Sequence, residues 1–283
     1  MLRRLMSISL REVLVPFLGL IVVGVAGLSL LLYAFQDRLI FYPQPLDRRV
    51  ADELTRAIAR SEPFSIDTDD GVRLEGWFLR GAGAPPWPLV IYFGGNAEEV
   101  SWLLPEWSRR SDWAVLLVNF RGYGLSGGNP SEKALCRDAL ALYDRVTRRG
   151  DVDRARVVSF GRSLGTGIAT YLAAQRPIAG VVLVSPYDSL AQVAHGVYPF
   201  LPVGMLLRHC FESVTRAPQI KTPLLALVAA RDTLIRPERS QGLVQAWGGP
   251  ARTELLAGVG HDDIHLHPVY WELIGSFLRE LRR

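Results

Sequence analysis

Apolar runs that alternate with helical stretches constrain the fold of this chain more than any other feature of its sequence. The runs occupy 87–95, 113–120, 156–161, 179–185 and 223–230 and end at glycine or polar residues. A strand that is buried on both faces of a parallel sheet needs such a run. Helical stretches are expected between and after them, near 97–109, 131–149, 164–176, 237–247 and 267–282. The pattern predicts an α/β fold with a mostly parallel sheet.

A hairpin is expected before the first parallel strand. The stretch "FSIDTDDGVRLEGWFLRG" alternates apolar and polar residues on both sides of Asp70-Gly71, a dipeptide typical of tight turns. No internal repeat is visible, and a hydrophobic content of 49% is ample for one large core. We therefore predict one α/β domain over 63–283, with an antiparallel N-terminal hairpin.

The N-terminal region contains a long uncharged segment. Residues 13–35 carry no charge and, as a helix, would extend about 35 Å, enough to cross a bilayer. The "GVA" at 24–26 resembles a signal-peptide cleavage site, but apolar residues continue beyond it for longer than a signal peptide usually allows. We predict a single uncleaved transmembrane anchor at 13–35, after a basic flank at 1–12.

Arginines on both sides of the anchor bear on its orientation. They are Arg3, Arg4 and Arg11 before the segment and Arg38, Arg48 and Arg49 after it. The positive-inside bias is therefore nearly balanced. We expect the N-terminus in the cytoplasm and the large domain on the other side of the membrane.

A linker at 36–62 contains the amphipathic stretch "DRRVADELTRAIARS". At helical spacing, its apolar residues share one face. Such a helix either lies on the membrane surface or packs on its own domain.

The run at 156–161 leads into "GRSLG", a G-x-S-x-G sequence between a predicted strand and a predicted helix. In this context the serine occupies a sharp, strained turn with its hydroxyl exposed above the sheet. Gly161 and Gly165 are needed because the turn brings the two backbones together. The following helix directs its N–H groups at the site. We interpret Ser163 as a nucleophile; the alternative is a purely structural turn.

A serine hydroxyl needs a base to accept its proton, and the chain has five histidines. His261 follows the strand-like "ARTELLAG" and precedes the last helix, which places it at the carboxyl end of a strand, where sites form in open α/β sheets. His195 and His209 fall in an insertion at 187–220, where a surface or packing role is expected. We predict His261 as the base.

The base in turn needs a carboxylate that holds its tautomer and stabilises the imidazolium. Asp232 follows the buried run at 223–230, again at a carboxyl end, and lies between Ser163 and His261 in the sequence. Asp188, after the preceding strand, is the alternative. The two aspartates that directly follow His261 are too close along the chain to fold back onto its ring. We predict Asp232 as the acid.

Backbone donors for an oxyanion are expected near 92–100, where "YFGGNAEEV" follows the first parallel strand and opens a helix. We predict the backbone N–H groups of Asn96 and Leu164 as the donors, each typically worth ~3 kcal/mol in the transition state. Gly94 and Gly95 would let the backbone approach a substrate closely. A plain glycine turn is the alternative.

Several function classes find little support. The net charge of +4 comes from scattered arginines, with no basic run or nucleic-acid motif, so we expect no nucleic-acid partner. His261 and His265 have the spacing of a helical zinc motif, but glycines precede them and Pro268 follows soon after. We expect no metal and no organic cofactor. The two cysteines, Cys136 and Cys210, either form a disulfide or remain buried thiols.

Taken together, the quoted motifs resemble the membrane-anchored branch of the α/β-hydrolase superfamily. The match rests on "YFGGNAEEV", "NFRGYGLSGG", "GRSLGTG", "SPYDSL", "ARDTLIRP" and "GVGHDD", in this order, and on "LIFYPQP" after the anchor. That branch includes eukaryotic protein depalmitoylases and bacterial serine aminopeptidase-like hydrolases. The resemblance spans residues 36–283 and implies Ser163, Asp232 and His261 as nucleophile, acid and base. Gly94 stands where many members have histidine, a departure that concerns how this loop is anchored.

The resemblance implies hydrolysis of esters or thioesters through an acyl-enzyme. The insertion is rich in apolar and aromatic residues over 195–211, so it either forms a cap suited to a fatty-acyl chain or an ordinary buried part of the domain. A lipid-like acyl substrate is therefore expected. A peptidase or an acyltransferase with the same three residues, and an idle membrane-anchored binding module, are the alternatives.

Overall fold

In the part of the chain described by the computed structural model, residues 10–110 and 112–282, eight strands form one sheet in the order β1-β2-β4-β3-β5-β6-β7-β8. Their bounds are β1 (Ser61–Asp67), β2 (Arg73–Leu79), β3 (Trp87–Phe93), β4 (Ala114–Val118), β5 (Val152–Arg162), β6 (Gly180–Val184), β7 (Leu224–Ala229) and β8 (Ala251–Leu256). β1 and β2 form the expected hairpin, β2 pairs antiparallel with β4, and all remaining pairs are parallel. The predicted fold class is confirmed.

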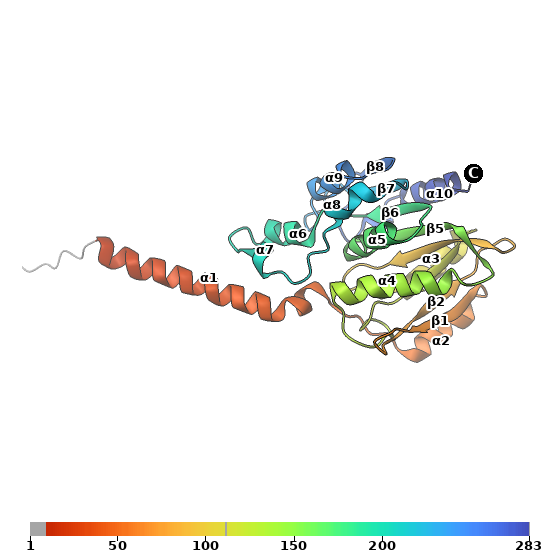
Figure 1. Cartoon of the computed structure of the whole chain (residues 1–283), viewed down its shortest axis with the longest axis horizontal. Coiled ribbons are helices and arrows are strands. Elements are labelled where there is room, and N and C mark those ends of the chain that lie inside the picture. Colours follow the sequence, from red (N-terminus) through yellow and green to blue (C-terminus); the bar gives the residue numbers. More distant parts are fainter. Residues whose placement is uncertain (1–9, 111, 283) are drawn as a thin grey trace, which may run out of the picture.

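Helices cover both faces of the sheet (Figure 1). α4 (Glu132–Val146), α5 (Leu164–Gln175) and α9 (Pro237–Gln245) pack on one face, and α2 (Arg48–Ala57), α3 (Leu103–Arg110) and α10 (Tyr270–Glu280) pack on the other. Strand β3 shows why its run is wholly apolar. Leu89 and Ile91 belong to the core under α4, α5 and α9, whereas Val90 and Tyr92 belong to the core on the opposite face of the sheet. A strand enclosed in this way has no solvent-facing side.

The N-terminal helix α1 (Leu10–Ile40) projects from the domain (Figure 1). Val13–Ile40 is long and apolar enough to cross a membrane, and its most apolar part is not buried in the protein. The helix continues past the uncharged segment to Ile40, and residues of the insertion bind its Gln36 and Asp37. Residues 1–9 of the predicted basic flank, with Arg3 and Arg4, lie outside the described residues.

The insertion at 187–220 folds into α6 (Leu190–Val197), α7 (Val203–Leu206) and α8 (Ser213–Arg216), and α6 and α7 lie beside the C-terminal part of α1 (Figure 1). In the linker, α2 packs on its own domain, where Thr55 accepts a hydrogen bond from the Trp77 indole (2.8 Å). Both cysteines are free thiols, and burial raises the pKa of Cys136 to about 12.

Candidate active site

The turn between β5 and α5 holds Ser163 in a strained conformation, with φ 49° and ψ −118°. The residues two positions before and after it must be glycines. A Cβ on Gly165 would overlap the Phe93 carbonyl, and a Cβ on Gly161 would overlap Gly165. The serine N–H donates to the Val184 carbonyl (2.9 Å), which fixes the turn to β6. A left-handed non-glycine residue costs about 1–3 kcal/mol, and such strain is typical of functional turns.

Three predicted residues meet at the carboxyl edge of the sheet, although they are far apart in sequence. The Ser163 hydroxyl lies 2.8 Å from His261 Nε2, and His261 Nδ1 lies 2.7 Å from Asp232 Oδ2. Because a carboxylate accepts, Nδ1 carries the proton, and Nε2 is left to accept from the serine hydroxyl. The arrangement therefore lets the imidazole take the hydroxyl proton.

Backbone donors hold the Asp232 carboxylate in place. Its other oxygen accepts from the N–H groups of Leu234 (3.0 Å) and Ile235 (2.8 Å), and its side chain is 1% exposed. Burial alone would raise the pKa of Asp232, but hydrogen bonding and the charge of His261, with the Ile235 N–H, lower it below its usual value. The carboxylate is thus ionised and correctly placed to stabilise an imidazolium.

The alternative candidates are occupied elsewhere. Asp188 binds Arg239 (2.9 Å) and the Ser189 N–H, and Asp263 accepts from the Gly260 N–H (2.6 Å) in the loop before His261. His209 binds Asp37 of α1 (2.9 Å), and His265 packs against the Trp102 ring. Within the described residues, no group of three or more histidine, cysteine or carboxylate side chains could hold a metal ion.

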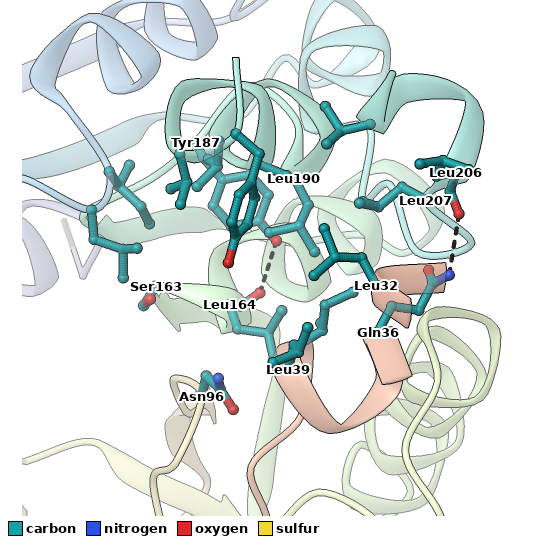
Figure 2. A pocket seen from close by; sticks show the side chains of 18 of the residues that line it. Leu32, Gln36, Leu39, Asn96, Ser163, Leu164, Tyr187, Leu190, Leu206 and Leu207 are labelled. Atoms are coloured by element: carbon teal, nitrogen blue, oxygen red, sulfur yellow. Dashed lines mark hydrogen bonds between the residues drawn. The ribbon is translucent and has the colours of Figure 1, made fainter. Parts of the chain in front are cut away.

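The two predicted oxyanion donors line the same cavity as Ser163, with Asn96 on a loop opposite the start of α5 (Figure 2). Leu164 is the first residue of α5, so its N–H has no partner within the helix. The Asn96 side-chain oxygen accepts from the N–H groups of Tyr42 (2.8 Å) and Ala97 (2.9 Å). The loop is thereby tied to the chain just after α1.

A buried ion pair beside the nucleophile was missed by the sequence analysis. Glu98 and Arg162 lie 3.1 Å apart, with side chains 4% and 14% exposed. Glu98 also accepts from the Gly95 N–H (2.6 Å) and the Tyr92 hydroxyl (2.7 Å). Burial raises the pKa of Tyr92 well above its ordinary value, so that hydroxyl remains a donor.

This ion pair joins the parts of the site. Arg162 immediately precedes the nucleophile and also donates to the His261 carbonyl (3.4 Å). Glu98 holds the glycine loop through the Gly95 N–H. Glu98 lies in "YFGGNAEEV" and Arg162 in "GRSLGTG". A charged residue within a motif that is expected to be buried was the sequence signal for this ion pair.

A cavity of about 300 Å³ opens above Ser163 and is lined mostly by apolar side chains of α1, α6 and α7 (Figure 2). Leu164 and Tyr187 form its floor near the serine, where the Tyr187 hydroxyl donates to the Leu164 carbonyl (3.2 Å). A concave apolar site with a few polar groups at one end is typical of a ligand pocket.

Comparisons with known proteins identify the family. Residues 88–210 match the family model described as serine aminopeptidase, S33. An uncharacterized protein of Mycobacterium tuberculosis is 34% identical over 269 residues, which cover 94% of this chain and 95% of the relative. An α/β-hydrolase domain-containing protein of Arabidopsis thaliana is 28% identical, over 78% of this chain and 77% of its own. The chain belongs to the α/β-hydrolase superfamily.

Solved structures of this superfamily share the fold. An esterase from Pyrococcus furiosus superposes with a TM-score of 0.67 at 20% identity, over 86% of this chain and 98% of its own. An acetyl xylan esterase from Paenibacillus gives 0.62 at 18% identity, over 87% and 98%. These superpositions show the same fold, and the family model described as a serine aminopeptidase supports a hydrolase.

Proposed function

We propose that this α/β-hydrolase is a membrane-anchored serine hydrolase that cleaves carboxylic esters or thioesters of apolar acyl groups. The observation that carries the proposal is the hydrogen-bonded series Ser163–His261–Asp232 at the floor of an apolar cavity. Nucleophile, base and orienting carboxylate are together within hydrogen-bond reach, as covalent catalysis requires.

In the proposed reaction, Ser163 Oγ attacks the carbonyl carbon while His261 Nε2 takes the hydroxyl proton. The backbone N–H groups of Asn96 and Leu164 stabilise the resulting oxyanion. Collapse of the tetrahedral intermediate expels the alcohol or thiol, which receives the proton from His261 and leaves an acyl-serine. Water, deprotonated by the same histidine, then attacks the acyl-serine, releases the acid and restores the serine hydroxyl.

The cavity lining favours an acyl group over a peptide. Among the described residues that line it, none is an aspartate or glutamate, so the lining offers no carboxylate to bind the free amino terminus of a peptide substrate. Its side chains are largely leucine, valine and isoleucine, with tyrosines, Gln36 and Asn96 as the main polar members. We therefore favour an esterase or thioesterase over an aminopeptidase.

We infer that α1 anchors the enzyme in a membrane, with the N-terminus in the cytoplasm and the catalytic domain outside. The length and hydropathy of Val13–Ile40 support the anchor. Protease protection of vesicles of known orientation tests the topology: cleavage of the domain from the cytoplasmic side would reverse the assignment.

A fluorophosphonate probe tests the proposed chemistry. Membranes that carry the wild-type chain should be labelled at Ser163, and Ser163→Ala should remain unlabelled. Absence of labelling in folded wild-type protein would contradict the assignment of Ser163 as a nucleophile and favour a binding module. Hydrolysis of peptides in preference to acyl esters would instead establish the peptidase alternative.

A further inference from the structure

The wall of the cavity that faces away from the sheet belongs to the membrane helix. Leu32, Leu39 and Ile40 of α1 line it together with α6 and α7, and Figure 2 shows the Leu32 and Leu39 side chains directed from α1 into the cavity. These positions extend over about two turns of the helix. The segment that anchors the protein therefore also shapes the space above Ser163.

Polar contacts fix this part of α1 to the insertion. The Gln36 amide donates to the Leu206 carbonyl (3.1 Å) and accepts from the Arg208 N–H (2.7 Å), although Gln36 itself is 5% exposed. Asp37 binds the Arg208 guanidinium (3.0 Å) and His209 Nε2 (2.9 Å). Such directional contacts hold the helix against α7, so the wall is a built part of the site.

The length of α1 places the cavity at the membrane surface. A bilayer core takes up about 20 helical residues, so a span that begins at Val13 ends near Leu32. The cavity lining begins at that same residue and continues to Ile40. In the anchored protein, this stretch of the lining would therefore lie where hydrocarbon gives way to headgroups, the depth at which the ester carbonyls of lipids lie.

The tip of the insertion is apolar and unprotected. Phe200 and Met205, before and within α7, are 90% and 89% exposed, and Val197 at the end of α6 is 49% exposed. Large side chains of this kind are costly in water and favourable in the outer part of a bilayer. Because α7 lies against α1, the tip of the insertion would enter the membrane leaflet next to the catalytic domain.

We propose that α1 forms part of the acyl-binding site, and that the enzyme draws a long-chain acyl ester or thioester from the bilayer into the seam between α1 and α6–α7. This proposal rests on the proposed hydrolase function and adds the source and path of the substrate. The acyl chain lies along Leu32 and Leu39, and its carbonyl reaches Ser163. The anchor thus selects substrate as well as location.

Chain-length selectivity tests the proposal in the full-length protein, reconstituted in phosphatidylcholine nanodiscs. Leu39→Trp narrows the seam, whereas Leu30→Trp places the same side chain on a part of α1 that does not line the cavity. Relative to Leu30→Trp, we expect Leu39→Trp to lower kcat/KM for p-nitrophenyl palmitate about tenfold or more, the size of effect that pocket volume produces. Hydrolysis of p-nitrophenyl acetate and labelling by a short fluorophosphonate should fall several-fold less than hydrolysis of the palmitate, because the short probes occupy only the end of the cavity at Ser163.

Parallel losses on both esters, or no difference between the two variants, would overturn the proposal while the labelling result upholds the hydrolase. Failure of the wild type to label would instead remove the proposed function itself. The source of the substrate has its own measurement: the rate should follow the mole fraction of the long-chain ester in the bilayer. Dependence on bulk concentration alone would overturn entry from the membrane.

The path of the chain can also be mapped directly. A long-chain fluorophosphonate with a diazirine at its far end should react with Ser163 and, on irradiation, attach to peptides from 32–40 or 190–207. Attachment only to peptides outside both segments, or a failure to label where the short probe succeeds, would contradict the seam.

Discussion

The carboxyl edge of the sheet and the seam between α1 and the insertion meet at Ser163, yet they are built differently. At the edge, Asp232 accepts bonds on both oxygens, and the elbow is locked by backbone contacts. At the seam, two polar residues of α1 hold apolar surfaces that remain open to a cavity. Under the proposed function, the difference reflects what each region does. Bond cleavage needs fixed angles and distances, whereas binding an alkyl chain needs mainly apolar volume.

Removal of the acid from the sheet edge should have the largest effect. Asp232→Asn can no longer hold the productive histidine tautomer, so we expect kcat for an acetyl ester to fall about 10⁴-fold. Asp188→Asn is the matched control, because Asp188 binds Arg239 and not His261. Equal losses in the two variants, measured by steady-state hydrolysis, would refute the assignment of Asp232.

The ion pair Glu98–Arg162 should produce the next largest effect. Glu98→Gln leaves Arg162 without its carboxylate and loosens the glycine loop, so we expect kcat to fall about 10–100-fold with a smaller change in KM. The same change should lower the free energy of unfolding, since it leaves a buried charge unpaired.

A second buried ion pair separates the effect on catalysis from the effect on stability. Asp138 pairs with Arg121, whose side chain is 5% exposed and also binds Asp70, and no hydrogen bond among the described residues joins this pair to Ser163, His261 or Asp232. Asp138→Asn should lower the melting temperature comparably but leave kcat per folded enzyme nearly unchanged. If both variants lose kcat equally, Glu98 has only a structural role.

The seam should respond more weakly and only for long chains. Gln36→Leu removes the bonds to Leu206 and Arg208 that hold α1 against the insertion, and we expect kcat/KM for a palmitoyl ester to fall about threefold because the cavity wall is held less firmly. Gln192→Leu, on α6 but bound to Arg239, is the control. A larger loss on the acetyl ester would show that the seam and the edge are not separable.

The smallest effect concerns stability in acid. Because the pKa of Asp232 is lower in the folded protein than its usual value, the unfolded chain binds this proton first as pH falls. The carboxylate thus stabilises the fold at neutral pH, and this contribution is lost as pH falls from its unfolded value near 4 through the folded pKa. Denaturant unfolding at several pH values should show a flatter acid dependence for Asp232→Asn than for wild type.

Much of the architecture follows from local patterns. Buried parallel strands must be continuously apolar, so β3 through β7 were visible as runs, and the elbow was visible because Gly161 and Gly165 are required for close backbone approach. The uncharged segment likewise predicted a helix able to cross a membrane. Each of these signals depends on residues that are neighbours in the chain.

Contacts between distant segments needed the tertiary structure. Asp188 and Asp232 both follow parallel strands, and only the folded loops show that Asp232 faces His261 while Asp188 faces Arg239. No periodicity pairs Glu98 with Arg162, since their contact depends on β3 and β5 being adjacent in the sheet.

The sequence by itself determined the sheet, the strained serine turn and the long apolar helix, because each is specified by local sterics and hydrophobicity. Only the tertiary structure decided that the last turns of α1 border the cavity above Ser163. That placement arises from the bonds of Gln36 and Asp37 to residues of the insertion, far along the chain. Such pairings are selected by the packing of the whole domain, which no local pattern encodes.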